Sequence, residues 1–72
     1  MEIGNKVKVA SAQHWSTKYF INVIGEVVEI LDCKEYANVG VLVKKEDNED
    51  VLLLMEDKTF YFDKDELEII GE

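Results

Sequence analysis

The chain has no arginine, only one cysteine and no long apolar run, and each of these absences narrows what the protein can be. A lone thiol, Cys33, leaves no partner for an intrachain disulfide, which argues against a stapled secreted scaffold and fits a reducing compartment. No apolar run approaches the roughly 18 residues that a membrane-spanning helix needs, and no signal-peptide pattern opens the chain. We therefore expect a cytoplasmic protein with no membrane partner.

The charge of the chain is strongly acidic. Sixteen aspartates and glutamates face eight lysines, which gives a net charge of -8. The first twenty residues hold three lysines against one acid, so the excess of acid falls entirely on residues 21–72. A negative field repels phosphate groups, and arginine is the usual reader of phosphate and guanine. This composition argues against direct binding to DNA, although the same charge also keeps a small protein soluble.

The stretch 23–31 is the segment around which we expect the fold to be built. As a strand, this stretch would have apolar side chains on both faces: Val23, Val27 and Leu31 on one face, and Ile24, Val28 and Ile30 on the other. A strand of this kind must be covered on both faces or must bend between two small sheets. Gly25 is the easiest place for such a bend, because glycine has no Cβ. A chain of 72 residues with a long bent strand predicts one small barrel domain spanning 1–72.

The remaining apolar runs predict an all-β chain of five to six short antiparallel strands. The expected strands lie at 5–10, 23–31, 39–45, 51–55, 60–62 and 67–70. Within the third, Val39, Val41 and Val43 share one face. Residues 63–66 predict a single 3-10 turn near the C-terminus, with Asp63 as the N-cap. The segment 11–20 has no regular period, so we expect a long loop in which Phe20 packs inward.

Three segments carry a resemblance to a known fold family. They are Ile3-Gly-Asn-Lys-Val-Lys-Val9, Ile24-Gly-Glu-Val-Val-Glu-Ile30 and Phe60-Tyr-Phe-Asp-Lys-Asp-Glu-Leu-Glu-Ile69. Their order resembles that of SH3-like small barrels, including the KOW and Mib–Herc2 types, and it covers most of the chain. The resemblance implies an SH3-like barrel. Two features depart from it: KOW-type nucleic-acid binders are usually basic, and 38–55 holds an extra strand or a longer hairpin, so that either 46–50 or 56–59 is the distal turn.

Catalytic and metal-binding patterns are poorly represented. His14 is the only histidine, and no nucleophile with its base is close to it in the sequence. The carboxylates lie in polar turns, where solvated charge is the ordinary state. Residues 47–50 lack the order of ligands found in a calcium-binding loop. We expect no enzymatic activity, no metal site and no cofactor.

Binding to another protein is the function class that the sequence favours. Small barrels commonly present an aromatic groove, for which the candidate residues are His14, Trp15, Tyr19 and Tyr61. The strand expected at 51–55 is apolar on both faces, which makes Leu52 and Leu54 candidates for self-association as a homodimer. The candidate acidic contacts with a partner are Glu46, Asp47, Glu49, Asp50, Glu56, Asp57, Asp63, Asp65, Glu66 and Glu68.

The sequence therefore predicts a non-enzymatic acidic module whose partner has a basic surface. Its sharpest form is a DNA mimic, by analogy with very small acidic phage inhibitors, that covers the DNA-binding surface of a sliding clamp or nuclease. One alternative is a nucleic-acid- or ribosome-associated module that uses Lys6, Lys8 and Lys18, with Trp15 and Tyr19 stacking on bases. The other is a regulatory subunit whose groove binds a peptide through Trp15 and Tyr61.

Overall fold

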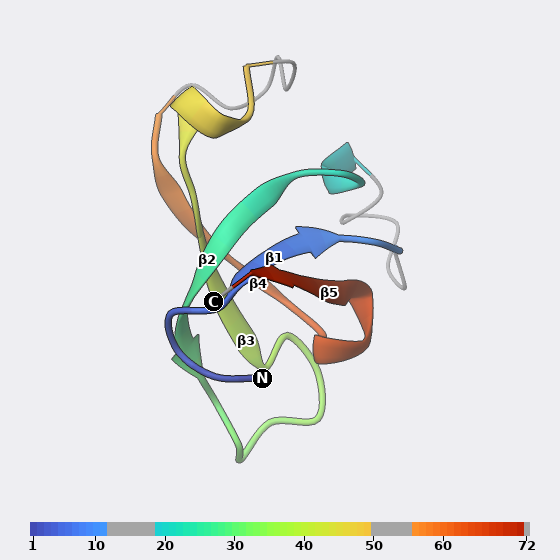
Figure 1. Cartoon of the computed structure of the whole chain (residues 1–72). Coiled ribbons are helices and arrows are strands. Elements are labelled where there is room, and N and C mark those ends of the chain that lie inside the picture. Colours follow the sequence, from blue (N-terminus) through green and yellow to red (C-terminus); the bar gives the residue numbers. More distant parts are fainter. Residues whose placement is uncertain (12–18, 50–55, 72) are drawn as a thin grey trace.

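The computed structural model describes residues 1–11, 19–49 and 56–71. Over these residues the chain forms one sheet of five antiparallel strands in the order β4-β3-β2-β1-β5 (Figure 1). The strands are β1 (Lys6–Val9), β2 (Ile24–Ile30), β3 (Val39–Val43), β4 (Lys58–Phe62) and β5 (Leu67–Gly71). Two 3-10 turns lie wholly within the described residues, η2 (Lys45–Asp47) and η3 (Lys64–Glu66). The all-β prediction is confirmed, as is the 3-10 turn before the last strand.

The described elements match the expected ones closely in position, with two differences. The turn η2 begins at Lys45, because β3 ends at Val43 and not at residue 45, and it continues into the acidic segment that we expected to be a simple turn. The strand β4 begins at Lys58 rather than at residue 60. The strand expected at 51–55 and most of the loop expected at 11–20 lie outside the described residues. Within the described part, no helix is long and apolar enough to cross a membrane.

Valine side chains make up most of the core. Its fully buried members, each at most 3% exposed, are Val7, Val9, Val23, Val27, Val39, Val41, Val43 and Phe62. The shared face predicted for the three valines of β3 is therefore confirmed. Phe20 packs its ring 4.7 Å from that of Phe60 and 5.7 Å from that of Phe62, centroid to centroid, so it points inward as expected. Burial of the valines of β1, β2 and β3 and of Phe62 of β4, with Leu67 of β5 packed against them, is what holds the small sheet together.

The irregular point of β2 is Val28 and not Gly25. The β2–β3 pairing shifts by one residue between Val27 and Glu29, which leaves Val28 as an extra residue on β2 and half exposed. A bulge switches the side-chain alternation, so Ile30 turns back to pack against the core. Gly25 has another role: a Cβ there would lie 2.7 Å from the carbonyl oxygen of Leu42, so the close approach of β3 requires glycine.

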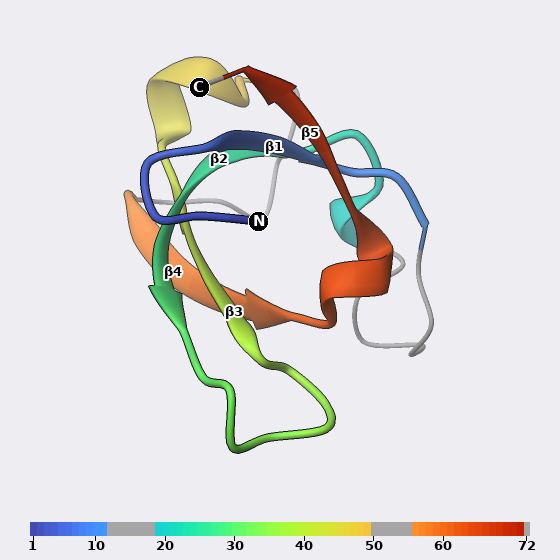
Figure 2. The same cartoon turned by 60° about the horizontal axis from the view of Figure 1, so that its bottom comes forward.

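The sheet curls around this core, as Figures 1 and 2 show, with β4 and β5 at its two ends. In the described part of the chain, β4 pairs with β3 and β5 pairs with β1. The segment from β4 to β5 passes through η3, so the two ends are connected by a single tight turn. This curvature places η2 at one end of the molecule and the loop 31–38 near the other (Figure 1).

Candidate functional site

Exposed carboxylates gather where the chain passes from β3 to β4. We call this region the acidic hairpin end; its described residues are 44–49 and 56–58, at the top of Figure 1. Its exposed acids are Glu46, Asp47, Glu49, Glu56 and Asp57. Asp50, which the sequence also nominated, lies outside the described residues. Five of the ten acids nominated from sequence therefore share one end of the molecule.

The buried side chain of Asn48 fixes the position of η2. Asn48 is only 7% exposed. Its Oδ1 accepts the backbone N–H of Ile24 at 2.8 Å, and its Nδ2 donates to the carbonyl oxygens of Ile24 at 2.9 Å and Lys44 at 2.8 Å. The amide thus pairs with β2 much as a neighbouring strand would, and it ties the acidic turn to the sheet.

The Glu56–Asp57 side of the hairpin end is tied to η2 as well. Asp57 Oδ1 accepts the backbone N–H of Lys45 at 2.9 Å. The first residue of η2 would otherwise leave that N–H to solvent, because the N-terminal donors of a helical turn have no partner within the turn. The two acidic sides of the hairpin end are therefore held at a fixed spacing.

The second acidic segment, 63–68, uses some of its carboxylates to build the fold. Asp63 and Glu66 form a reciprocal capping box around η3, in which Glu66 Oε1 accepts the N–H of Asp63 at 2.9 Å. Asp63 Oδ1 also accepts the N–H of Ala37 at 2.6 Å. Glu66 has an exposed fraction of 0%, so it does not belong to the exposed acidic surface that the sequence suggested. Asp65 and Glu68 are exposed.

The lysines of β1 lie opposite acids on neighbouring strands. Lys6 pairs in register with Glu26 of β2, and Lys8 Nζ lies 3.9 Å from Glu68 Oε2 of β5. Each lysine thus has a carboxylate beside it, which reduces the positive potential of this face. Lys18, the third lysine nominated with them, lies outside the described residues.

Tyr61 lies on the opposite face of β4 from Phe60 and Phe62. Its hydroxyl donates a hydrogen bond to Glu29 Oε1, and this bond raises the pKa of Tyr61 above its usual 10.0. A Cβ on Gly40 would lie 2.9 Å from the Tyr61 ring, so the ring covers the glycine between the two partners. Tyr19 is 57% exposed. The remaining aromatic-groove candidates, His14 and Trp15, and the self-association candidates, Leu52 and Leu54, lie outside the described residues.

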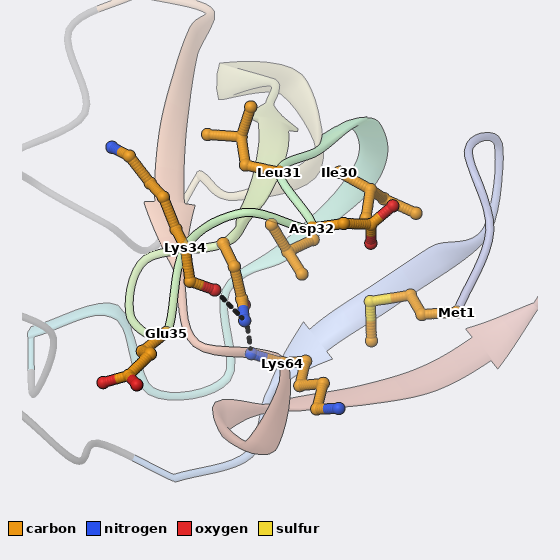
Figure 3. A pocket seen from close by; sticks show the side chains of 9 residues that line it. Met1, Ile30, Leu31, Asp32, Lys34, Glu35 and Lys64 are labelled. Atoms are coloured by element: carbon orange, nitrogen blue, oxygen red, sulfur yellow. Dashed lines mark hydrogen bonds between the residues drawn. The ribbon is translucent and has the colours of Figure 1, made fainter.

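One groove opens between Met1, the loop 31–38 and η3 (Figure 3). Its volume is about 490 Å³. Asn38 Oδ1 accepts the backbone N–H of Lys64 at 3.1 Å, which joins the loop to η3. The lining residues are apolar and of both charge signs: Met1, Ile30, Leu31, Asp32, Lys34, Glu35, Asn38, Val39 and Lys64. Among the described residues, no group of three or more histidine, cysteine or acidic side chains is placed to hold a metal ion.

Sequence reasoning did not identify Asn48 as a structural residue. An asparagine in an acidic turn is read as a local turn former, because its side chain commonly bonds nearby backbone. Two of its three hydrogen bonds go to Ile24, 24 residues away, and only the folded sheet brings that backbone close. Comparison of the chain with known proteins gives no further information about the site, since no protein-family model, curated protein or solved structure matches it.

Proposed function

We propose that this chain is a non-enzymatic acidic protein-binding module that covers a basic, DNA-binding surface of a protein partner. The observation that carries the proposal is the acidic hairpin end, whose carboxylates are exposed on a backbone held by Asn48 and Asp57. A fixed pattern of charge is what a charge-complementary partner needs, because ordering flexible side chains and loops on binding costs free energy.

The net charge of -8 supports the same proposal through association kinetics. Opposite fields steer two proteins together and raise the association rate, and they penalise partners of like charge. A DNA-binding surface is a strong positive field that already accepts an array of phosphates. The acids of the hairpin end would occupy part of that surface and exclude the nucleic acid.

The nucleic-acid-binding alternative receives less support from the lysine face. Lys6 faces Glu26, and Lys8 lies beside Glu68, so a phosphate approaching either lysine also meets a carboxylate. The peptide-binding alternative is favoured by one observation, the groove of Figure 3, whose lining includes the apolar residues Ile30, Leu31 and Val39. The five-strand sheet and the 3-10 turn before β5 support the SH3-like resemblance, which is compatible with either protein or peptide binding.

A pair of matched variants separates the leading function from the peptide alternative. The hairpin variant carries Glu46→Gln, Asp47→Asn and Glu49→Gln; the control carries Glu2→Gln, Asp32→Asn and Glu35→Gln, all at exposed positions. Both lower the net negative charge equally, so they differ only in the position of the removed charges. Asp32 and Glu35 also line the groove of Figure 3.

The assay uses immobilised wild type to retain proteins from an extract of the native host, followed by purification of the retained protein and measurement of its affinity. We expect the retained protein to be a DNA-binding protein that duplex DNA competes off the immobilised chain. Its affinity should fall as salt rises, and it should bind the control variant but not the hairpin variant. A retained protein that neither duplex DNA nor the hairpin variant affects would overturn the proposal, and loss in the control alone would assign binding to the groove.

A further inference from the structure

A second groove lies on the outer face of the sheet, across β5, β1, β2 and β3. Its volume is about 330 Å³. Its apolar lining comes from Ile24, Leu42 and Ile70, with Gly25 between them. The charged residues around it are Lys6, Lys44, Glu26 and Asp47. Two lysines and two acids make this groove locally neutral in a chain whose net charge is -8.

Ile70 reaches this groove because β5 is irregular at that point. The β1–β5 pairing matches Val7 with Ile69 and Lys6 with Gly71, which leaves Ile70 as an extra residue on β5. A bulge of this kind redirects a side chain, and bulges concentrate near functional surfaces. Ile70 remains 46% exposed although it borders an apolar groove. A large, partly exposed aliphatic side chain therefore lies at the border of an apolar groove.

We propose that the occupant of this groove is a second copy of the chain, in a two-fold symmetric dimer. In such a dimer each copy places Ile70 in the groove of the other, against Ile24 and Leu42. A two-fold axis requires a self-complementary surface, and a projecting side chain beside its own receiving groove meets that requirement. This inference does not rest on the proposed function, although the groove shares Lys44 and Asp47 with the acidic hairpin end.

The charges around the groove favour a second copy over other occupants. A strongly basic partner would be opposed by Lys6 and Lys44, and a strongly acidic one by Glu26 and Asp47. A second copy offers an acid to each lysine and a lysine to each acid. A standard interface buries about 800 Å² per partner, roughly a sixth of the 4999 Å² surface of this chain.

The two binding events respond to salt in opposite directions. Salt weakens the few charge pairs across the groove, but exposed pairs of this kind contribute little, whereas the repulsion between two chains of net charge -8 is screened as well, so the dimer strengthens as salt rises. Binding to a basic partner weakens under the same change. The salt response therefore separates failure of the dimer from failure of the proposed function.

Two adjacent isoleucines provide a matched test by sedimentation equilibrium of the full chain over a range of concentrations. Ile69 is 48% exposed, close to the 46% of Ile70, but it pairs with buried Val7 and so belongs to the other side of the sheet. We expect Ile70→Ala to raise the dimer dissociation constant by about tenfold or more, as for a central interface side chain, and Ile69→Ala to change it by less than about twofold. Equal effects of the two substitutions would overturn the proposal.

A second measurement uses the unmutated chain, so it does not depend on how a variant folds. In an equal mixture of ¹³C-labelled and unlabelled protein, isotope-filtered spectra report only contacts between copies. We expect cross-peaks from the methyl groups of Ile70 to those of Ile24 and Leu42. A protein that stays monomeric at the highest soluble concentration in high salt, or a dimer whose contacts lie elsewhere, would contradict the assignment.

Discussion

Replacing Asn48 by alanine tests whether the acidic hairpin end is held in place by a single side chain. Asn48 makes three hydrogen bonds to backbone groups of Ile24 and Lys44, each 2.8 to 2.9 Å long. Because the side chain is 7% exposed, the backbone groups that it leaves have little access to replacement water. The substitution therefore acts through lost hydrogen bonds and not through lost charge.

The expected loss of stability follows from the number of bonds. At about 1 kcal/mol for each, Asn48→Ala lowers the free energy of unfolding by about 3 kcal/mol. Asn5 is a matched control, since it is 9% exposed and its side chain accepts one bond, from the N–H of Glu2 at 2.8 Å. Asn5→Ala should lower the free energy of unfolding by about 1 kcal/mol. Asn48→Asp should cost at least as much as Asn48→Ala, because a carboxylate would face two carbonyl oxygens.

Urea denaturation followed by tryptophan fluorescence gives these free energies, and the chain has one tryptophan. A domain of this size has a total stability of roughly 4 to 11 kcal/mol, so a loss of about 3 kcal/mol lies well within measurable range. Amide exchange at Ile24 should accelerate in Asn48→Ala beyond the effect of global destabilisation. A loss for Asn48→Ala no larger than that for Asn5→Ala would refute the reasoning.

Two further predictions concern close packing and a tyrosine. Gly25→Ala should destabilise the fold by about 2 kcal/mol or more, because its Cβ would lie 2.7 Å from the carbonyl oxygen of Leu42. Gly71→Ala should be tolerated, since the nearest atom to its Cβ would be 3.7 Å away. Thermal melting of the two variants checks this difference. Tyr61 should be titrated spectrophotometrically, and Glu29→Gln should bring its raised pKa back toward 10.0. Because that pKa is higher in the folded chain, the bond stabilises the fold fully below pH 10 and the contribution is lost as pH rises through the folded value; an unchanged tyrosine titration in the glutamine variant would contradict this.

The fold was predictable from the sequence where apolar side chains alternate. Val39, Val41 and Val43 follow the strand period, and all three are buried as expected. The η3 turn was predictable as well, because Asp63 and Glu66 have the spacing of a capping box. These features depend on residues a few positions apart, so a single sequence contains the information.

The features that the sequence did not reveal depend on residues far apart in the chain. The bulge at Val28 depends on how β2 pairs with β3. A run with apolar residues on both strand faces does not reveal where the register of that pairing shifts. Glu66 looked like one more surface acid, yet the turn around it buries the carboxylate completely. The hydrogen bonds of Asn48 to Ile24 likewise exist only once the sheet has formed.

The central claim is that carboxylates in a fixed pattern on the acidic hairpin end bind a basic surface. The most direct test is the affinity of the retained partner for the hairpin variant and for its equally charged control, measured by calorimetry at low and high salt. We expect the hairpin variant to bind at least about tenfold more weakly than the control at low salt, with the difference shrinking at high salt. Equal affinities for the two variants would show that total charge, and not its position, governs binding, and would contradict the claim.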